Sequence, residues 1–299
     1  MPRLAASSPL ASDSTASTAN TKRRPALRAV IFDVDGTLAE TELDGHLPAF
    51  NQAFADAGLD WHWSPAEYLE LLAVTGGKER ITHYALRKHA EFARRADFPQ
   101  LVANLHRRKT ELYAARAAAG AITLRPGIRR LLDEIAAAGL LAAIATTTSP
   151  DSVRALINGQ LGAAGEARFA CIGAGDVVAS KKPAPDIYQY VIDALGLAAD
   201  ECLAIEDSAV GTAAALAAGI PVVVTAHAAT AAENFAGALA VLDGLGAADA
   251  PARSLAGPAP AGGFVSLTDL IRWHGSKNQQ QSAFAAPQHA QDIVARTGI

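Results

Sequence analysis

Short apolar runs alternate with longer segments of helical periodicity along most of this chain. The first run, Ala29–Phe32, contains only apolar residues, including β-branched and aromatic ones. Such an uninterrupted run is typical of a strand that is buried on both faces, as in a parallel sheet. Four similar runs span residues 140–145, 169–172, 203–205 and 220–225, and helical patterns span 128–138, 151–161, 187–195 and an alanine-rich segment up to Ala218. This alternation predicts an α/β fold with a Rossmann-like, doubly wound parallel sheet.

The weaker apolar runs are expected to complete the sheet. Residues 121–124 are predicted as a strand that leads back into the core, and residues 238–242 as an edge strand. Residues 246–263 are rich in Ala, Pro and Gly and are predicted as a loop. A short helix is expected near residues 267–273.

A helical insertion separates the first strand from the rest of the sheet. Its first amphipathic helix ends near Gly58, and three further periodic segments span residues 65–74, 78–91 and 98–119. We therefore divide the chain into an α/β core, an inserted helical domain and two terminal extensions. Their bounds are 27–38 with 121–274 for the core, 39–120 for the insertion, 1–26 for a disordered N-terminal extension and 275–299 for a loose C-terminal tail.

Composition and charge narrow the possible partners. The chain has 299 residues, half of them hydrophobic, and a net charge of −4, which argues against nucleic-acid binding. No apolar run reaches the ~18 residues that a membrane span requires. Cys171 and Cys202 lie far apart in apolar stretches, which fits a reducing compartment. We expect a cytoplasmic monomer without nucleic-acid or membrane partners; the alternative is a plastid protein, with the Ser-rich, acid-poor residues 1–26 as a transit peptide.

Polar side chains stand at the carboxyl ends of the predicted strands, where ligands bind in open α/β sheets. Asp33 and Asp35 follow the first strand, four hydroxyl residues begin at Thr146, and Glu206 and Asp207 end a later strand. An Asp-x-Asp pair alone usually marks a solvated turn, and one of the hydroxyls serves as a helix N-cap. Four hydroxyls exceed what capping needs, and carboxylates are the hard oxygen ligands that Mg²⁺ prefers.

A lysine pair lies between the third strand and the next helix. Lys181 and Lys182 precede Pro183, a pattern that by itself is more often a solvated loop than a site. Its position between strand and helix places it at the same edge of the sheet as the acids.

With Gly36 and Thr37 after it, the Asp33-Val34-Asp35 segment resembles the first motif of the haloacid-dehalogenase (HAD) superfamily. Most members transfer phosphoryl groups through an aspartyl-phosphate. The resemblance implies a HAD-like core with a small α-helical cap inserted after the first strand. It also implies that Asp33 is the nucleophile and a magnesium ligand, and that Asp35 is the general acid/base and binds the metal through its backbone carbonyl.

The later motifs complete the site that this resemblance implies. Thr146 is expected to donate to the transferring phosphoryl group, assisted by the amide of Thr147. Lys182 is expected to neutralise the nucleophile and the phosphoryl group, with Lys181 as the alternative. Asp207 is expected to bind Mg²⁺ directly. Glu206 is expected to act through a metal-bound water or the surrounding hydrogen bonds.

Segments of the cap closely resemble the CbbY-like proteins. They lie at residues 39–51, 58–63 and 75–81. Family members are xylulose-1,5-bisphosphate phosphatases that accompany red-type ribulose-bisphosphate carboxylase, and they remove the C1 phosphate from a misfire product that inhibits this Calvin-cycle enzyme. The resemblance implies a small-molecule phosphosugar substrate.

A bisphosphate ketose needs a second cationic pocket away from the metal. Lys78 and Arg80 lie at a helix start after two glycines, where side chains and backbone N–H groups bind phosphate well. Glu42 and His46 look like ligands for the sugar hydroxyls. Trp61 and Trp63 are expected to form the apolar core of the cap.

Three alternatives stay open at this point. A β-phosphoglucomutase has the same fold, metal and nucleophile but returns the phosphoryl group to a sugar. A phosphoglycolate phosphatase acts on a small substrate that leaves Lys78 and Arg80 without a partner. A binding module without catalysis is disfavoured because Asp33, Asp35 and Asp207 are all present.

Overall fold

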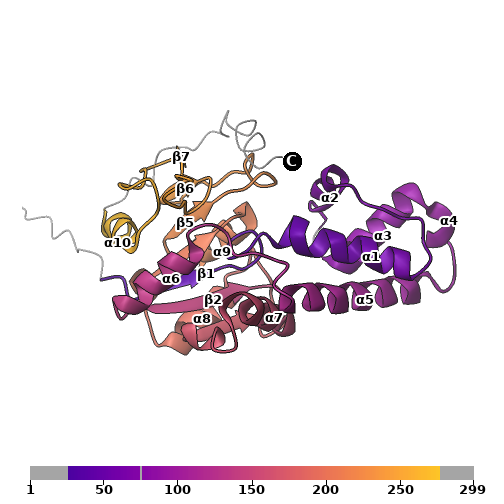
Figure 1. Cartoon of the computed structure of the whole chain (residues 1–299), viewed down its shortest axis with the longest axis horizontal. Coiled ribbons are helices and arrows are strands. Elements are labelled where there is room, and N and C mark those ends of the chain that lie inside the picture. The colour runs from indigo at the N-terminus through magenta and orange to yellow at the C-terminus, as the bar shows by residue number, and fades with distance from the viewer. Residues whose placement is uncertain (1–25, 75, 277–299) are drawn as a thin grey trace, which may run out of the picture.

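A seven-stranded sheet forms the centre of the molecule (Figure 1). The computed structural model describes residues 26–74 and 76–276. The strand order is β3-β2-β1-β4-β5-β6-β7, with β1 to β6 parallel and β7 antiparallel to β6. The strands are β1 (Ala29–Phe32), β2 (Leu141–Thr146), β3 (Cys171–Ala174), β4 (Cys202–Glu206), β5 (Val222–Thr225), β6 (Ala240–Leu242) and β7 (Ser254–Ala256). The predicted α/β fold is confirmed, and the order runs outward from β1 in both directions.

The register of the sheet decides which strand ends meet. Phe32, the last residue of β1, lies beside Ile144 of β2 and Ile205 of β4. The N–H of Asp33 then donates to the carbonyl of Ile205 at 3.0 Å. Parallel strands end at one edge of the sheet, so this register brings Asp33 level with Glu206, the residue after Ile205.

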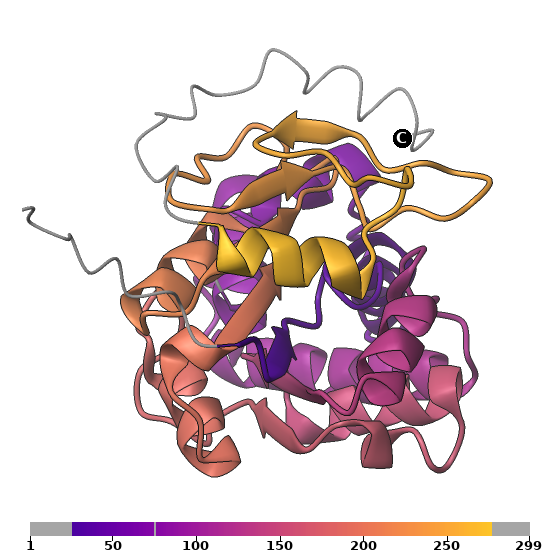
Figure 2. The same cartoon turned by 90° about the vertical axis from the view of Figure 1, so that its left-hand side faces the viewer.

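Helices cover both faces of the sheet because successive strand residues point to opposite sides. Val30 and Phe32 pack on one face with α6 (Ile128–Ala137), α7 (Pro150–Leu161) and α10 (Leu267–Gly275). Ala29 and Ile31 pack on the other face with α8 (Asp186–Leu195) and α9 (Ala209–Ala217). Figure 2 shows α10 in yellow close to the last strands. Single 3₁₀ turns lie at η2 (Glu166–Arg168) and η3 (Ala199–Glu201).

The helices between β1 and α6 have an apolar core of their own and extend to one side of the sheet (Figure 1). Trp61 and Trp63 are buried in it beside Phe54, which confirms the interpretation of both tryptophans as core residues. The segment begins with a π-helical turn, η1, and its long last helix packs against α7. The elements are η1 (Glu42–His46), α1 (Leu47–Asp56), α2 (Pro65–Leu71), α3 (Gly77–Lys88), α4 (Ala90–Ala93) and α5 (Phe98–Ala118).

Two strand predictions and one loop prediction were wrong. Residues 121–124 form no strand; only Leu124 makes a bridge, to Ala39, because this segment is the return linker and has no further neighbour to pair with. Residues 240–242 form β6, which is not an edge strand, because β7 pairs with its outer side. β7 lies inside 246–263, which was predicted as a loop: three half-buried residues carry too little pattern to reveal a strand.

Predictions for both chain ends lie outside the described residues. They concern the N-terminal extension, apart from Ala26, and the tail from residue 277 onward. Within residues 26–74 and 76–276, no helix is long and apolar enough to cross a membrane.

Candidate active site

The carboxyl ends of β1 and β4 bring Asp33 and Glu206 to the same buried ammonium group. Lys182 Nζ donates to Asp33 Oδ1 at 2.7 Å and to Glu206 Oε1 at 2.6 Å. It also donates to the carbonyl of Ala145, the next-to-last residue of β2, at 2.9 Å. Lys181 instead pairs with Asp176 on the surface at 3.0 Å, so the geometry favours Lys182 of the two lysines.

Three carboxylates form a buried acidic cluster. Asp33, Glu206 and Asp207 each offer an oxygen within 4.8 Å of the other two. Burial raises the pKa values of Asp33 and Asp207 well above their ordinary range, and Glu206 raises them further, against the opposing charge of Lys182. One ammonium does not balance three carboxylates, and Glu206 Oε2 is buried without a hydrogen-bond partner among the described residues. The cluster therefore fits a cation with a preference for oxygen ligands.

Two glycines allow the backbone to approach these carboxylates. Gly36 has a φ of +77°, and a Cβ there would lie 2.4 Å from Asp207 Oδ2. A Cβ on Gly211, in the first turn of α9, would lie 1.9 Å from Glu206 Oε2. Neither position has room for a side chain, so the shape of the cluster depends on both residues being glycine.

Asp35 lies at the boundary between the sheet and the inserted helices. Its carboxylate accepts a hydrogen bond from Thr148 Oγ1, and His46 Nε2 lies 3.4 Å from Asp35 Oδ1. Burial by itself raises the pKa of Asp35, but the hydrogen bonds and charge of His46 and the hydroxyl of Thr148 outweigh burial and hold this pKa well below its ordinary value. Asp35 is therefore ionised in this arrangement.

The hydroxyl run after β2 is divided between buried and exposed positions. Thr146 is buried, and its Oγ1 accepts the N–H of Thr148 at 3.2 Å. The side chain of Thr147 is exposed. Ser149 is the N-cap of α7, as expected for one member of the run.

In the inserted helices, Arg80 and Glu42 are connected through a residue that the sequence analysis did not single out. Arg80 is buried; its Nε donates to the carbonyl of Leu71 at 3.1 Å and its Nη1 to Tyr68 Oη at 3.1 Å. The Tyr68 hydroxyl in turn donates to Glu42 Oε2. Lys78, two residues before Arg80 in the first turn of α3, is exposed.

Comparison with known proteins identifies the family. Residues 27–219 match the haloacid dehalogenase-like hydrolase family. Protein CbbY of Cupriavidus necator is 49% identical over 248 residues, which cover 83% of this chain and 97% of the relative. This chain belongs to the CbbY proteins, within the haloacid dehalogenase-like hydrolases. The resemblance inferred from the motifs is thereby confirmed.

Two further CbbY and HAD relatives bear on the activity. The crystal structure of a CbbY mutant from Rhodobacter sphaeroides, in complex with xylulose 1,5-bisphosphate, is 44% identical with a TM-score of 0.65, covering 73% of this chain and 94% of that one. Phosphoglycolate phosphatase of Rhodospirillum rubrum is 34% identical over 203 residues, 67% of this chain and 80% of that protein. This CbbY family member is an enzyme of the HAD phosphatases, and the relatives support a small phosphosugar as its substrate.

Several residues of the site carried no signal in the sequence. Lys109 Nζ lies 2.9 Å from His46 Nδ1, Tyr188 donates to Glu206 Oε1, and His227 Nε2 lies 2.9 Å from Asp207 Oδ2. Each belongs to an element distant in the chain from its partner and outside the recognised motifs. Of the three, only His227 had a position that offered a clue, two residues after the end of β5.

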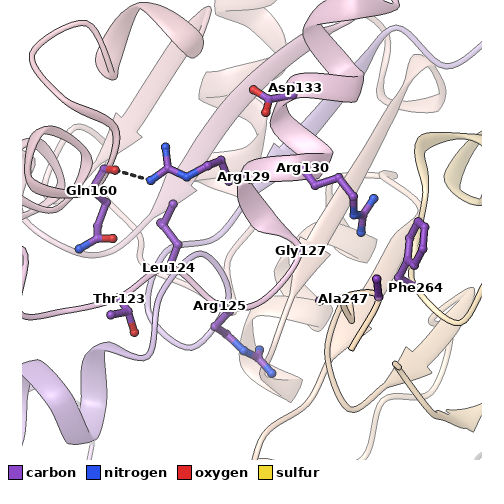
Figure 3. A pocket seen from close by; sticks show the side chains of 11 residues that line it. Thr123, Leu124, Arg125, Gly127, Arg129, Arg130, Asp133, Gln160, Ala247 and Phe264 are labelled. Carbon is purple, nitrogen blue, oxygen red and sulfur yellow. Dashed lines mark hydrogen bonds between the residues drawn. The ribbon is translucent and has the colours of Figure 1, made fainter. Parts of the chain in front are cut away.

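A cavity of about 620 Å³ is lined by the linker before α6, by the first turns of α6 and by Phe264, among others (Figure 3). Its arginines do not converge: Arg129 donates to the carbonyl of Gln160 at 2.5 Å, and Arg130 stacks on Phe264. Arg125 donates to the carbonyls of Gly36 and Thr225, which supports the turn after Asp35. Of these three arginines, Arg125 is the one that contacts the turn of the active site.

Proposed function

We propose that this protein hydrolyses xylulose 1,5-bisphosphate to xylulose 5-phosphate and phosphate with Mg²⁺, and thereby protects the carboxylase of the Calvin cycle. The observation that carries the proposal is the 44% identity to the CbbY whose crystal structure holds this bisphosphate. The two cysteines are free thiols, which supports a reducing compartment such as the cytoplasm. We further propose that the enzyme acts as a monomer.

Asp33, Glu206 and Asp207 have the donor set for Mg²⁺, with the backbone carbonyl of Asp35 as a further ligand. Mg²⁺ held by these residues would offset the repulsion between the substrate phosphate and the carboxylates. The ammonium group of Lys182 contributes a second positive charge at this place, since its Nζ contacts Asp33. Thr146, at the end of β2, is proposed to donate to the transferring group with the amide of Thr147.

The chemistry is divided between the two aspartates of the first motif. Asp33 attacks phosphorus, and a P–O bond to Asp33 forms as the bond to the sugar oxygen breaks. Asp35 gives a proton to that leaving oxygen and then takes one from the water that releases phosphate from Asp33. The low pKa of Asp35 suits the second step. The approach of the phosphate dianion, a like charge, raises this pKa and allows Asp35 to carry the proton for the first step.

Residues 39–120 are proposed to be the cap, and they supply specificity. Glu42 and His46 bind sugar hydroxyls, and Lys78 and Arg80 bind the phosphate that stays on the product. The exposed Lys78 side chain is free to turn toward a ligand. Arg80 uses Nε and Nη1 for its partners among the described residues, which leaves part of its donor fork for an anion.

A phosphate-release assay with Mg²⁺ tests the proposal. We expect xylulose 1,5-bisphosphate to be hydrolysed with far higher kcat/KM than phosphoglycolate, and glucose 1-phosphate not to be converted to its 6-phosphate. Asp33→Asn is the negative control, because an amide is a far poorer nucleophile and turnover is expected to vanish. A preference for phosphoglycolate, interconversion of the glucose phosphates, or turnover by pure Asp33→Asn protein would contradict the assignment.

A further inference from the structure

A buried histidine stands behind the acidic cluster. His227 follows the carboxyl end of β5 and is 8% exposed. Its Nε2 lies 2.9 Å from Asp207 Oδ2, yet His227 is not part of the group formed by Asp33, Glu206 and Asp207. It contacts one member of the cluster without belonging to it.

The hydrogen bonds around the ring define its tautomer. The N–H of Ala229 points to Nδ1 at 3.3 Å, so Nδ1 is an acceptor. The ring proton is therefore on Nε2, which donates to Asp207. The backbone of His227 is held as well, because its N–H donates to Thr230 Oγ1 at 3.1 Å and its carbonyl accepts the N–H of Thr230 at 3.0 Å. The ring has a defined position and a defined donor.

The Asp207 carboxylate is held at both oxygens. Thr37 Oγ1 donates to Oδ1 at 3.4 Å, while His227 donates to Oδ2 at 2.9 Å. The space for this arrangement exists because residue 36 is glycine: a Cβ there would lie 2.8 Å from His227 Nε2. Of the two donors, His227 is the closer.

We propose that His227 is a positioning residue for the divalent cation, acting through Asp207. The proposal rests on the metal site of the proposed function. A hydrogen bond that already holds a carboxylate ligand in one orientation removes the entropic cost of ordering that ligand when the ion binds. Loss of the hydrogen-bond partner typically weakens metal affinity 10- to 100-fold. His227 is thus expected to influence metal binding before any substrate is present.

Binding of Mn²⁺ to the full-length protein without substrate tests this, with free Mn²⁺ measured by electron paramagnetic resonance. We expect His227→Leu to weaken Mn²⁺ binding about 10- to 100-fold. His227→Gln is expected to restore most of the affinity, because its amide N–H reaches about as far as Nε2. His227→Asn retains a polar group but is too short to reach Asp207, and it should lose affinity as the Leu variant does.

His274→Leu is the matched control, since His274 is also buried but bonds the carbonyl of Asp200. Its Mn²⁺ affinity should equal that of the wild type. Wild-type affinity in both His227→Leu and His227→Asn, or an equal loss in His227→Gln, would overturn the positioning role. Failure of the wild type to bind Mn²⁺, or binding that Asp207→Asn leaves unchanged, would instead refute the metal site on which both proposals rest.

Discussion

Two buried lysines lie in opposite electrostatic surroundings. Burial alone lowers the pKa of Lys182, but the carboxylates of Asp33 and Glu206 raise it above its ordinary value. Lys109 contacts the ring of His46 instead, and burial lowers its pKa from 10.5 to about 8. A buried cation without a carboxylate in contact destabilises the fold, which is a cost that residues near active sites often carry.

We predict that Lys109→Met stabilises the protein at neutral pH. Between pH 8 and 10.5 the unfolded chain binds more protons than the folded one, because Lys109 loses its proton at lower pH when it is buried. The free-energy cost of burying the charged lysine therefore falls in this window, and the stability of the fold rises with pH. At about 1.4 kcal/mol per pKa unit, the variant should gain about 1–3 kcal/mol in the free energy of unfolding at pH 7. The gain should shrink toward pH 10. Urea unfolding at both pH values measures it, with Lys88→Met, an exposed lysine of α3, as control. An equal pH dependence in Lys109→Met and wild type would contradict the prediction.

A single methyl group at residue 211 should disrupt the acidic cluster. The added Cβ of Gly211→Ala would overlap Glu206 Oε2 at 1.9 Å, and a shift of Glu206 also breaks its contact with Lys182. We expect a stability loss of about 1–3 kcal/mol and a fall in kcat/KM of about 100-fold. Gly275→Ala is the control, because a Cβ there has no neighbour within 4 Å. Unchanged kinetics in Gly211→Ala would show that Glu206 has no role.

At the scale of the helices, hydrogen bonds from Arg80 to Tyr68 and from Tyr68 to Glu42 join α3, α2 and η1. The contact of Arg80 with the carbonyl of Leu71 ties α3 to the end of α2, and Tyr68 carries the connection to η1, next to His46 and Asp35. Arg80 therefore supports the structure of the helical segment in addition to its proposed ligand role. Lys78 is exposed, and its side chain makes no such hydrogen bond to the residues that the structure describes, which makes Lys78 the cleaner test.

We predict that Lys78→Ala impairs only the bisphosphate reaction. A charge-assisted contact to phosphate is worth roughly 1.5–3 kcal/mol, so kcat/KM should fall about 10- to 100-fold for xylulose 1,5-bisphosphate. Nitrophenyl phosphate has no second phosphate and should be hydrolysed at the wild-type rate. Arg80→Ala should lower kcat/KM for both substrates, and the loss should be larger for the bisphosphate. Lys88→Ala, at the far end of α3, is the matched control. Equal losses on both substrates for Lys78→Ala would remove this residue from the phosphate pocket.

At the scale of the whole molecule, we expect the stability of the fold to depend on metal binding at the edge of the sheet. The cluster residues Asp33, Glu206 and Asp207 come from two adjacent strands at the centre of the sheet, where repulsion between carboxylates opposes folding. An ion that binds only the folded chain relieves this repulsion and adds its binding free energy to the stability.

Removal of the metal should therefore lower both activity and the unfolding temperature. We expect EDTA to abolish phosphate release and Mg²⁺ to restore it. At an Mg²⁺ concentration of 100 times Kd, the linked stabilisation is about 2.7 kcal/mol, which raises the midpoint of thermal unfolding by roughly 5–10 °C. In Asp207→Asn this rise should disappear. Full activity in EDTA would exclude a metal-dependent mechanism.

The sequence alone determined the α/β fold, most of the central strands and the identity of the strand-end residues. Apolar runs and helical periods are local patterns, and parallel strands must end at one edge of the sheet. These two facts were enough to predict that Asp33, Lys182 and Glu206 lie together, which the 2.6–2.7 Å contacts bear out. Lys182 was chosen over Lys181 through the resemblance to the HAD motifs, and the contacts of the two lysines in the structure favour that choice.

Only the tertiary structure decided the contacts between residues that lie far apart in the chain. Lys109 contacts His46, which is 63 residues away in the chain, and His227 contacts Asp207 from the end of the neighbouring strand. Tyr68 forms hydrogen bonds with both Arg80 and Glu42. A lone lysine, histidine or tyrosine has no periodic signal, and its role arises from which partner packing presents to it. β7 escaped prediction for the same reason: a three-residue strand is stabilised by its neighbour β6 and hardly by its own sequence.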